Sequence, residues 1–207
     1  MKPAGLILAG GRGSRMGGAT PKPLVELAGR PLIAHVIERL EGQVAPLIVA
    51  AREGEGYDPF GLTLAPDRRP GFAGPLAGIE AGLHAVLAIG NSAPTHVLIV
   101  AGDTPFLPAD LRARLASKSG HRPVIAHFAA RPQPATSLWP VAVLHDLTRW
   151  LDDGRPLAIR AFLDSVGYET VEIAPSIAAP DGNPFFNINT PEDLVAAEEF
   201  LRRPSAS

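Results

Sequence analysis

The sequence predicts an α/β fold with a mostly parallel central sheet and helices on both faces, and three observations support this. Short apolar runs alternate with helix-like segments over the first hundred residues, as in β–α–β units joined by right-handed crossovers. Residues 96–101 form an unbroken apolar run, which is typical of a strand covered on both faces. With 207 residues, of which 46% are hydrophobic and 19% charged, the chain fits a single domain, residues 1–207, with a sizeable core.

In the first half, strands and helices are predicted from runs of apolar residues and their spacing. The expected strands are residues 5–9, 46–51, 62–65 and 96–101, with a short extended piece at 23–27 that turns at Ala28 and Gly29. Pro31 is expected to open a helix that buries Leu32, Ile33, Val36, Ile37 and Leu40. A glycine-bearing loop at 71–78 begins a second helix, which is expected to bury Leu76, Ile79, Leu83, Val86 and Leu87.

The second half is less regular, but it ends in a clear helix signal. Helices are expected at 108–115, 141–151 and 156–166, and strands at 123–128, 136–139 and 168–173. Thr190 is a good N-cap, Pro191 falls at the first helical position, and Glu192 and Asp193 suit the positive end of a helix. Residues 203–207 are expected to fray.

A glycine-rich segment, residues 10–22, follows the first predicted strand and is the strongest functional signal in the chain. It contains the glycines at 10, 11, 13, 17 and 18, together with Arg12, Arg15 and Lys22, and the first acidic residue of the chain is Glu26. Glycines let the backbone approach a ligand closely, and consecutive N–H groups form an anion-binding concavity. The segment is therefore predicted to hold a polyphosphate.

Two well-known phosphate motifs do not match this segment. A P-loop requires Lys-Ser or Lys-Thr after its last glycine, but Gly18 is followed by Ala19 and Thr20. The dinucleotide fingerprint G-x-G-x-x-G has Met16 at its third glycine position, which argues against a dehydrogenase. A plain glycine-rich turn with solvent-exposed arginines is the alternative interpretation.

Asp103 is the strongest candidate for a metal ligand. It follows the buried run 96–101, and ligands of open parallel sheets bind outside the carboxyl ends of the strands. The segments 10–22 and 67–78 are expected at the same edge. A carboxylate there is well placed to hold Mg²⁺, which takes one or two carboxylates and fills its other positions with water and substrate phosphates. The alternative is that Asp103 only caps the following turn.

A cationic loop and a magnesium carboxylate together indicate a nucleoside triphosphate as substrate. Ser14 lacks the glycine-flanked elbow of a serine nucleophile, and the six histidines show no metal-ligand spacing. Phosphoryl-type transfer depends mainly on positioning and charge neutralisation. A phosphate monoester as acceptor, with a second pKa of about 6, needs no general base at neutral pH. These features favour nucleotidyl transfer, and a nucleotide-binding adaptor without turnover is the alternative from another class.

Composition excludes several other classes. A net charge of −2 argues against a general affinity for nucleic acid, and the absence of cysteine removes disulfides and thiolate metal sites. No apolar run approaches the ~20 residues of a membrane span, and the amino-terminal run is too short for a signal sequence. We expect a cytoplasmic enzyme without a membrane or nucleic-acid partner.

An ordered set of motifs resembles the molybdenum cofactor guanylyltransferases (MobA type) over nearly the whole chain. The matching pieces are residues 8–11, 15–18, Lys22, 29–32, 74–79, 103–105, 138–139 and 187–193. The resemblance implies a three-layer, Rossmann-like nucleotidyltransferase fold, with residues 1–107 binding the nucleotide and 108–202 the acceptor. It also implies transfer of GMP from GTP to molybdopterin with release of pyrophosphate, and makes proteins that deliver molybdopterin or act as molybdoenzyme chaperones candidate partners.

The resemblance also implies roles for individual residues. The catalytic residues would be Arg15, Lys22 and Asp103, with Asp103 as the Mg²⁺ ligand. The nucleotide-binding residues would be Leu8, Ala9, Gly10, Gly11, Lys22, Asp67 and Asp103, with Asp67 reading guanine. Gly78, Asn187 and Asn189 would lie on the pterin side, the two asparagines near the metal or the pterin.

Three departures from the family pattern concern substrate detail. Pro21 stands where the family commonly has Asp, Ala-Ala-Arg at 50–52 replaces Asn-Ala-Asn, and Pro-Gln-Pro at 132–134 replaces a His-Pro. A molybdopterin cytidylyltransferase and a sugar-1-phosphate nucleotidyltransferase are the nearest alternatives. Ala9-Gly10-Gly11 favours guanine over cytosine, and residues 187–193 do not support a sugar acceptor.

Overall fold

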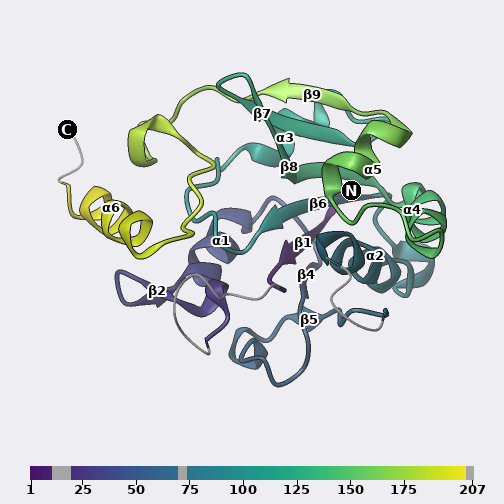
Figure 1. The fold of residues 1–207 in the computed structure, drawn as a ribbon, viewed down its shortest axis with the longest axis horizontal. Helices are drawn as coiled ribbons and strands as arrows, with labels where there is room; N and C mark the ends of the chain where they lie inside the picture. Colours follow the sequence, from purple (N-terminus) through teal and green to yellow (C-terminus); the bar gives the residue numbers. More distant parts are fainter. Residues whose placement is uncertain (11–19, 70–73, 204–207) are drawn as a thin grey trace.

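A mixed seven-stranded sheet forms the centre of the computed structural model, which describes residues 1–10, 20–69 and 74–203 (Figure 1). The strand order is β5-β4-β1-β6-β8-β7-β9. The strands are β1 (Ala4–Leu8), β4 (Leu47–Ala50), β5 (Thr63–Leu64), β6 (His96–Ala101), β7 (Val124–Phe128), β8 (Arg131–Pro140) and β9 (Glu169–Glu172). A separate hairpin contains β2 (Glu26–Leu27) and β3 (Arg30–Pro31).

The sheet is mostly parallel, as the sequence predicts. β5, β4, β1 and β6 run parallel to one another, and β9 runs parallel to β7. β8 is antiparallel to both of its neighbours, β6 and β7. In the centre, Leu6 of β1 pairs with Ile48 of β4 and Ile99 of β6, and all three side chains are buried. The apolar runs of β1, β4 and β6 therefore lie where both faces of the sheet are covered.

Helices cover both faces of this sheet, which confirms the predicted three-layer α/β architecture. They are α1 (Leu32–Leu40), α2 (Gly74–Leu87), α3 (Leu111–Ala116), α4 (Leu144–Asp152), α5 (Ile159–Val166) and α6 (Pro191–Arg202). One apolar cluster packs α2, α4 and α5 against one face, where Trp139 stacks on Phe162 with ring centroids 5.5 Å apart. A second cluster packs α1 and α3 against the other face.

Some predicted elements differ from the structure in detail. Leu87 is 49% exposed and not buried, because α2 ends there and the chain turns away from the core. Residues Lys22–Leu24 form a 3-10 helix, so that only the end of the predicted extended piece is a strand. The strand predicted at 136–139 extends back to Arg131, and the helix predicted from 141 begins as a 3-10 turn before α4.

The carboxyl-terminal helix α6 packs beside β2, at some distance from the central sheet (Figure 1). A third apolar cluster joins it to the amino-terminal half through Leu27, Leu32 and Ile188. Phe106 contacts Phe200 of α6 edge-to-face, with ring centroids 5.6 Å apart. This packing brings the segment before α6 back toward residues 20–30.

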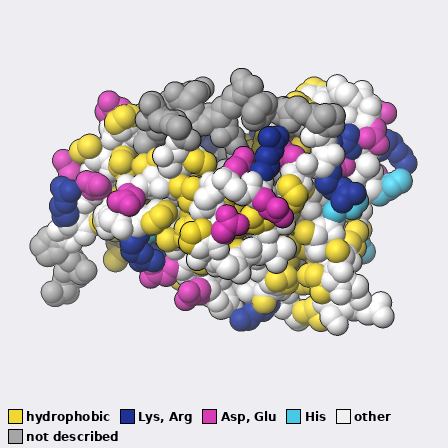
Figure 2. Space-filling view, turned by 90° about the horizontal axis from the view of Figure 1, so that it is seen from below, with side chains coloured by type: hydrophobic (Ala, Val, Ile, Leu, Met, Phe, Trp, Pro, Cys, Tyr) yellow, Lys and Arg dark blue, Asp and Glu magenta, His cyan; other side chains and the backbone are white. Residues whose placement is uncertain are grey.

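The surface carries charges of both signs. In the space-filling view, Lys and Arg side chains are interspersed with Asp and Glu side chains on the visible face (Figure 2), in keeping with the net charge of −2. Among the helices of residues 1–10, 20–69 and 74–203, none combines the length and the apolar character that crossing a bilayer requires.

Candidate active site

The carboxyl ends of β1 and β6 meet at one edge of the sheet and place Asp103 there. These strands are parallel neighbours, and the N–H of Gly102 donates to the carbonyl oxygen of Leu8 at 3.0 Å. A side chain at position 102 would lie 3.1 Å from Pro23, so the absence of a Cβ allows the chain after β6 to approach residues 22–24 closely. Asp103 and Lys22 are thereby brought together.

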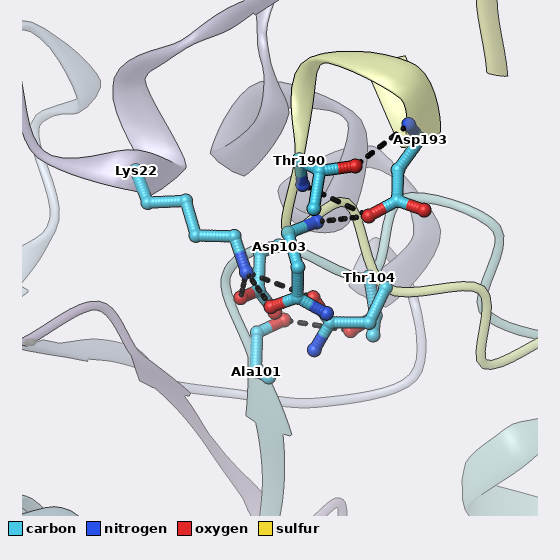
Figure 3. A network of polar contacts seen from close by, with 8 residues as sticks. Lys22, Ala101, Asp103, Thr104, Thr190 and Asp193 are labelled. Carbon is cyan, nitrogen blue, oxygen red and sulfur yellow. Dashed lines mark hydrogen bonds and ion pairs between the residues drawn. The ribbon is translucent and has the colours of Figure 1, made fainter. Parts of the chain in front are cut away.

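Lys22 is surrounded by three oxygen atoms from two distant parts of the chain (Figure 3). Its Nζ donates to Oδ2 of Asp103 in a short ion pair, to Oδ1 of Asn187 at 2.9 Å and to Oδ1 of Asn189 at 2.5 Å. The side chains of Lys22 and Asp103 are each 17% exposed. We call Asp103, Asn187 and Asn189 the oxygen cluster. An ammonium has three N–H donors, so this cluster satisfies all of them.

The start of α6 holds the two asparagines in place. Thr190 is the N-cap, and its hydroxyl accepts from the N–H of Asp193 at 3.2 Å, while the Asp193 carboxylate accepts from the N–H of Thr190 at 2.9 Å. The same carboxylate accepts from the N–H of Asn189 at 2.8 Å (Figure 3). The N–H of Ile188 donates to the carbonyl oxygen of Asp103 at 3.1 Å. The predicted helix cap is therefore confirmed, and it orients the backbone from which both asparagines project.

The oxygen cluster has a composition that suits a hard cation. Oδ1 of Asp103 is buried and has no hydrogen-bond partner in the described part of the chain, so a strong acceptor is left free beside the two amide oxygens. Within those same residues, no group of three or more His, Cys, Asp or Glu side chains is arranged to hold a metal. One carboxylate with neutral oxygens matches Mg²⁺, which keeps water and substrate phosphates as its remaining ligands.

A pocket of about 320 Å³ lies beside this cluster, over the carboxyl ends of β1 and β4. Such a volume is at the lower end of the range for small-molecule sites. Its lining residues are Leu8, Ala9, Gly10, Pro21, Ala50, Ala51, Arg52, Glu55, Asp67, Gly74, Pro75 and Gly78. Pro21 directly precedes Lys22, so the pocket wall is followed in the chain by the residue that contacts the oxygen cluster.

Asp67 provides a carboxylate in this pocket. Burial raises its pKa above the ordinary value, the charge of Glu55 adds to that rise, and the charge of Arg52 opposes it. Gly78 faces Asp67: a Cβ at position 78 would lie 3.9 Å from Oδ1 of Asp67 and 3.2 Å from the Cβ of Ala50. A partly buried carboxylate among apolar walls can accept hydrogen bonds from the donor edge of a bound base.

The loop after β4 is tied to the loop after β1 by a buried tyrosine. Tyr57 is fully buried, and its hydroxyl donates to the carbonyl oxygen of Ala9 at 3.1 Å. Burial, with a smaller contribution from the charge of Glu55, raises the pKa of this phenol, which keeps it a neutral donor. The backbone N–H of Arg52 donates to Glu55 at 3.1 Å. These bonds hold one wall of the pocket against the start of the glycine-rich segment.

The structure brings the predicted site residues into two adjoining groups. Lys22, Asp103, Asn187 and Asn189 meet around one ammonium. The pocket is lined by Leu8, Ala9, Gly10, Asp67 and Gly78. Gly78 thus belongs to the pocket group, beside Asp67. Gly11 and Arg15 lie outside the described residues, as do the other glycines and arginines of positions 11–19.

Arg52 and Glu55 are pocket residues that the sequence did not single out as ligand contacts. The available signal was their place in the loop after β4, since the loops at the carboxyl ends of parallel strands line the ligand crevice. Arg52 appeared only as a departure from a family pattern. Glu55 gave no signal, because a polar loop residue of this kind is ordinarily a solvated side chain.

Comparisons with known proteins identify relatives of the chain. A family model described as the MobA-like NTP transferase domain matches residues 5–170. The molybdenum cofactor guanylyltransferase of Rhizobium meliloti (strain 1021) is 43% identical over 204 residues, with 96% of this chain and 92% of the relative covered. The protein of the same name from Cereibacter sphaeroides is 40% identical, with 98% of this chain and 99% of the relative covered.

Solved structures share the fold at lower sequence identity. Molybdopterin-guanine dinucleotide biosynthesis protein A from Archaeoglobus fulgidus has a TM-score of 0.73 at 24% identity, with 96% of this chain and 98% of that chain covered. A 4-diphosphocytidyl-2C-methyl-D-erythritol synthase from Anaerococcus prevotii has a TM-score of 0.72 at 12% identity, with 98% and 96% covered. At these identities the likeness shows the fold alone.

Proposed function

The chain belongs to the MobA-like NTP transferase family, and on this premise we propose that it is a molybdenum cofactor guanylyltransferase. It would transfer GMP from GTP to the phosphate of molybdopterin, forming molybdopterin guanine dinucleotide and pyrophosphate. Relatives that carry this name cover nearly the full length of the chain. The observation that carries the proposal is the contact of Lys22 with Asp103 beside a pocket that contains Asp67.

In this reaction an oxygen of the acceptor phosphate attacks the α-phosphorus of GTP. A bond forms between that oxygen and the α-phosphorus, and the bond from the α-phosphorus to the bridging oxygen breaks, so that pyrophosphate leaves with the electron pair. Negative charge builds up on the leaving oxygens. Lys22 places a positive charge beside Asp103, and in the proposed complex this fixed charge would stabilise the transition state. Arg15 would add to it by its place in the motif.

Asp103, with the amide oxygens of Asn187 and Asn189, would hold Mg²⁺. The free, buried Oδ1 of Asp103 and the oxygen-only character of the cluster support this assignment. When bound, Mg²⁺ supplies charge neutralisation for the triphosphate. Lys22 would then exchange part of its contact with the oxygen cluster for contact with phosphate oxygens.

The pocket would bind the guanosine part of GTP. Leu8, Ala9 and Gly10 line the pocket, and Asp67 would accept from the N1–H and 2-amino groups of guanine. Gly11 would contact the triphosphate, and Gly78 would border the acceptor side of the pocket. The acceptor phosphate needs no general base, because at neutral pH its second proton, with a pKa of about 6, is largely lost.

The test is a product assay with purified protein, Mg²⁺ and molybdopterin, supplied separately with GTP, CTP or ATP. Release of pyrophosphate with GTP, together with a guanine dinucleotide product of the expected mass, supports the proposal. Turnover with CTP indicates the cytidylyltransferase alternative, and turnover only when a sugar 1-phosphate replaces molybdopterin as the acceptor indicates the sugar nucleotidyltransferase alternative. Binding of GTP without pyrophosphate release with either acceptor contradicts a transferase.

Location and partners are a further part of the proposal. We place the activity in the cytoplasm, where GTP is available, with proteins that supply molybdopterin and receive the dinucleotide as its partners. The nucleotide-binding half is assigned to residues 1–107 and the acceptor-binding half to 108–202. The contact of Lys22 with Asn187 joins one residue from each half, so the two substrates would meet there.

A further inference from the structure

A buried ion pair joins the segment that carries Asp67 to α2. In this pair, Nε of Arg69 donates to Oε2 of Glu80 and Nη2 donates to Oε1, both at 2.7 Å. The guanidinium and the carboxylate therefore meet through two parallel hydrogen bonds, the geometry that orients both groups most strongly. The Glu80 side chain is only 4% exposed and that of Arg69 is 21% exposed.

The same guanidinium reaches a third element. Its Nη1 donates to Oδ1 of Asp152 in α4 at 2.8 Å, and Nη2 also donates to the carbonyl oxygen of Thr148 at 3.3 Å. The Asp152 side chain is 62% exposed, so this contact is the weaker of the two ion pairs. Arg69 thus links the segment after β5 with α2 and α4.

Stability alone does not explain a charged pair at this position. Glu80 is the one carboxylate among the buried residues of the described chain. Burial by itself would raise its pKa, but hydrogen bonds from Arg69 and Thr148, with the charges of Arg69 and His84, lower the pKa below its ordinary value. The pair is therefore charged at neutral pH. Apolar residues of similar volume are often as stable as such a pair, so the pair needs another reason.

The position of the pair relative to the pocket suggests that reason. Asp67 faces Gly78 of α2. Two residues later, Arg69 contacts Glu80, which is also two residues after Gly78. Oδ1 of Asp67 lies 3.9 Å from the place of a Cβ on Gly78, and Arg69 meets Glu80 at 2.7 Å. The segment 67–69 is thus held against α2 at two successive points. Of these, only the ion pair is a directional bond.

We propose that Arg69 and Glu80 are positioning residues that fix the Asp67 carboxylate at the base end of the pocket and so set nucleotide selectivity. The inference rests on the proposed function, in which Asp67 reads guanine. Asp67 does not lie in a helix or strand that would fix its position, since β5 ends at Leu64 and α2 begins at Gly74. The ion pair supplies this constraint, and a carboxylate misplaced by 1 Å makes a poorer hydrogen bond with the base.

The experiment measures binding of GTP and of inosine triphosphate (ITP) by calorimetry without an acceptor. ITP lacks only the 2-amino group of guanine, so the ratio of the two Kd values reports contacts to that group. We expect Arg69→Gln and Glu80→Gln each to lower the preference for GTP about tenfold, the loss of one well-placed hydrogen bond to a charged group. Arg69→Lys should lower it less than Arg69→Gln, because lysine keeps the charge but not the paired geometry.

Two control variants separate positioning from stability. Asp164→Asn breaks the exposed pair with Arg160 in α5, whose atoms are 2.8 Å apart, without touching the pocket. Leu111→Ala creates a cavity in the cluster on the opposite face of the sheet, which lowers stability. Both should keep the wild-type ratio of Kd values, Leu111→Ala despite a lower Tm.

The outcomes distinguish this inference from the proposed function. If Arg69→Gln lowers the Tm but keeps the wild-type ratio, the pair is only structural and the inference is overturned. If Glu80→Gln does not fold, the ratio of Kd values is taken from Arg69→Gln and Arg69→Lys, which alter a partly exposed side chain. A wild type that binds GTP and ITP equally contradicts the role of Asp67 itself, and the inference with it. Failure of guanylyl transfer with a normal GTP preference contradicts only the proposed reaction.

Discussion

The ammonium of Lys22 donates to Oδ1 of Asn187 at 2.9 Å, although the two residues are 165 positions apart in the chain. The contact joins the end of the glycine-rich segment to the segment that leads into α6. The same ammonium donates to the other two members of the oxygen cluster, in which Asp103 provides the only carboxylate. The charge of this cluster therefore depends on one acidic residue, which makes it open to test by single substitutions.

Asp103→Asn is expected to lower the rate of transfer by about 10²-fold or more, because the cluster loses its negative charge at the point where the metal and triphosphate meet. The substitution keeps the volume of the side chain, so the fold should be preserved and the circular dichroism spectrum should match that of the wild type. Asp110→Asn, which removes an exposed pair with Arg114, is the matched control and should keep the wild-type kcat. Equal kcat values for wild type and Asp103→Asn would rule out the metal role.

Lys22→Met is expected to change two quantities in opposite directions. The rate of transfer should fall about 10²–10³-fold, because a fixed positive charge is lost from the transition state. Binding of Mn²⁺ without nucleotide, followed by electron paramagnetic resonance, should become tighter, since the ammonium no longer occupies the three oxygens of the cluster.

Lys118→Met provides the control for this substitution. Lys118 donates to the carbonyl oxygen of Thr170 at 2.8 Å on the exposed surface, so its loss removes the same charge away from the site. It should leave both the rate and the Mn²⁺ affinity unchanged. Weaker or unchanged Mn²⁺ binding by Lys22→Met would show that the oxygen cluster does not hold a metal.

The preference for GTP over ITP is expected to depend on pH through Asp67. Because burial raises the pKa of this carboxyl, it gains a proton at a higher pH than an exposed aspartate, and it then loses an acceptor. The preference should therefore fall as the pH is lowered below neutral. Titration of the triphosphate affects both nucleotides alike and cancels in the ratio of Kd values.

Asp67→Asn should abolish this pH dependence and lower the preference at neutral pH. A pKa that is higher in the folded than in the unfolded state means that the folded state binds more protons between the two values, so wild-type stability falls as the pH rises through that window. Asp67→Asn should lack this loss in denaturant titrations. An unchanged pH profile of selectivity in Asp67→Asn would exclude the carboxylate from the base site.

Thr190→Ala is expected to reduce the free energy of unfolding by about 1 kcal/mol, because α6 loses the hydroxyl that accepts from the N–H of Asp193. Thr190→Ser keeps that acceptor and should lose much less. Chemical denaturation followed by tryptophan fluorescence measures both variants. A loss in Thr190→Ser as large as in Thr190→Ala would assign the effect to packing of the methyl group.

Local patterns in the sequence were sufficient for much of the fold and for part of the site. β6 has the predicted bounds, since an apolar run that begins after His96 and ends before Gly102 has few other interpretations. Asp103 could be placed at the carboxyl edge because its position follows from that strand. The cap at Thr190 was evident from the types of four consecutive residues.

Other features depend on contacts between distant residues and leave no local pattern. The length of β8 was hidden by Pro132 and Pro134, since proline disfavours the strand assignment although it is tolerated there. In the sequence, Arg69 and Glu80 look like two separate solvated charges. Their ion pair is buried because α2 packs against α4 in the fold. The partners of Lys22 could be predicted as a group of site residues, but not as its hydrogen-bond acceptors.

The separation of Lys22 from its partners also has a consequence for synthesis of the protein. The residues that line the pocket all lie between positions 8 and 78, whereas the oxygen cluster needs Asn187 and Asn189. A nascent chain on the ribosome thus completes the sequence of its nucleotide pocket long before it can form the cluster. Chains released before residue 187 would lack both asparagines of the cluster, so they could not catalyse the transfer as the full-length enzyme does.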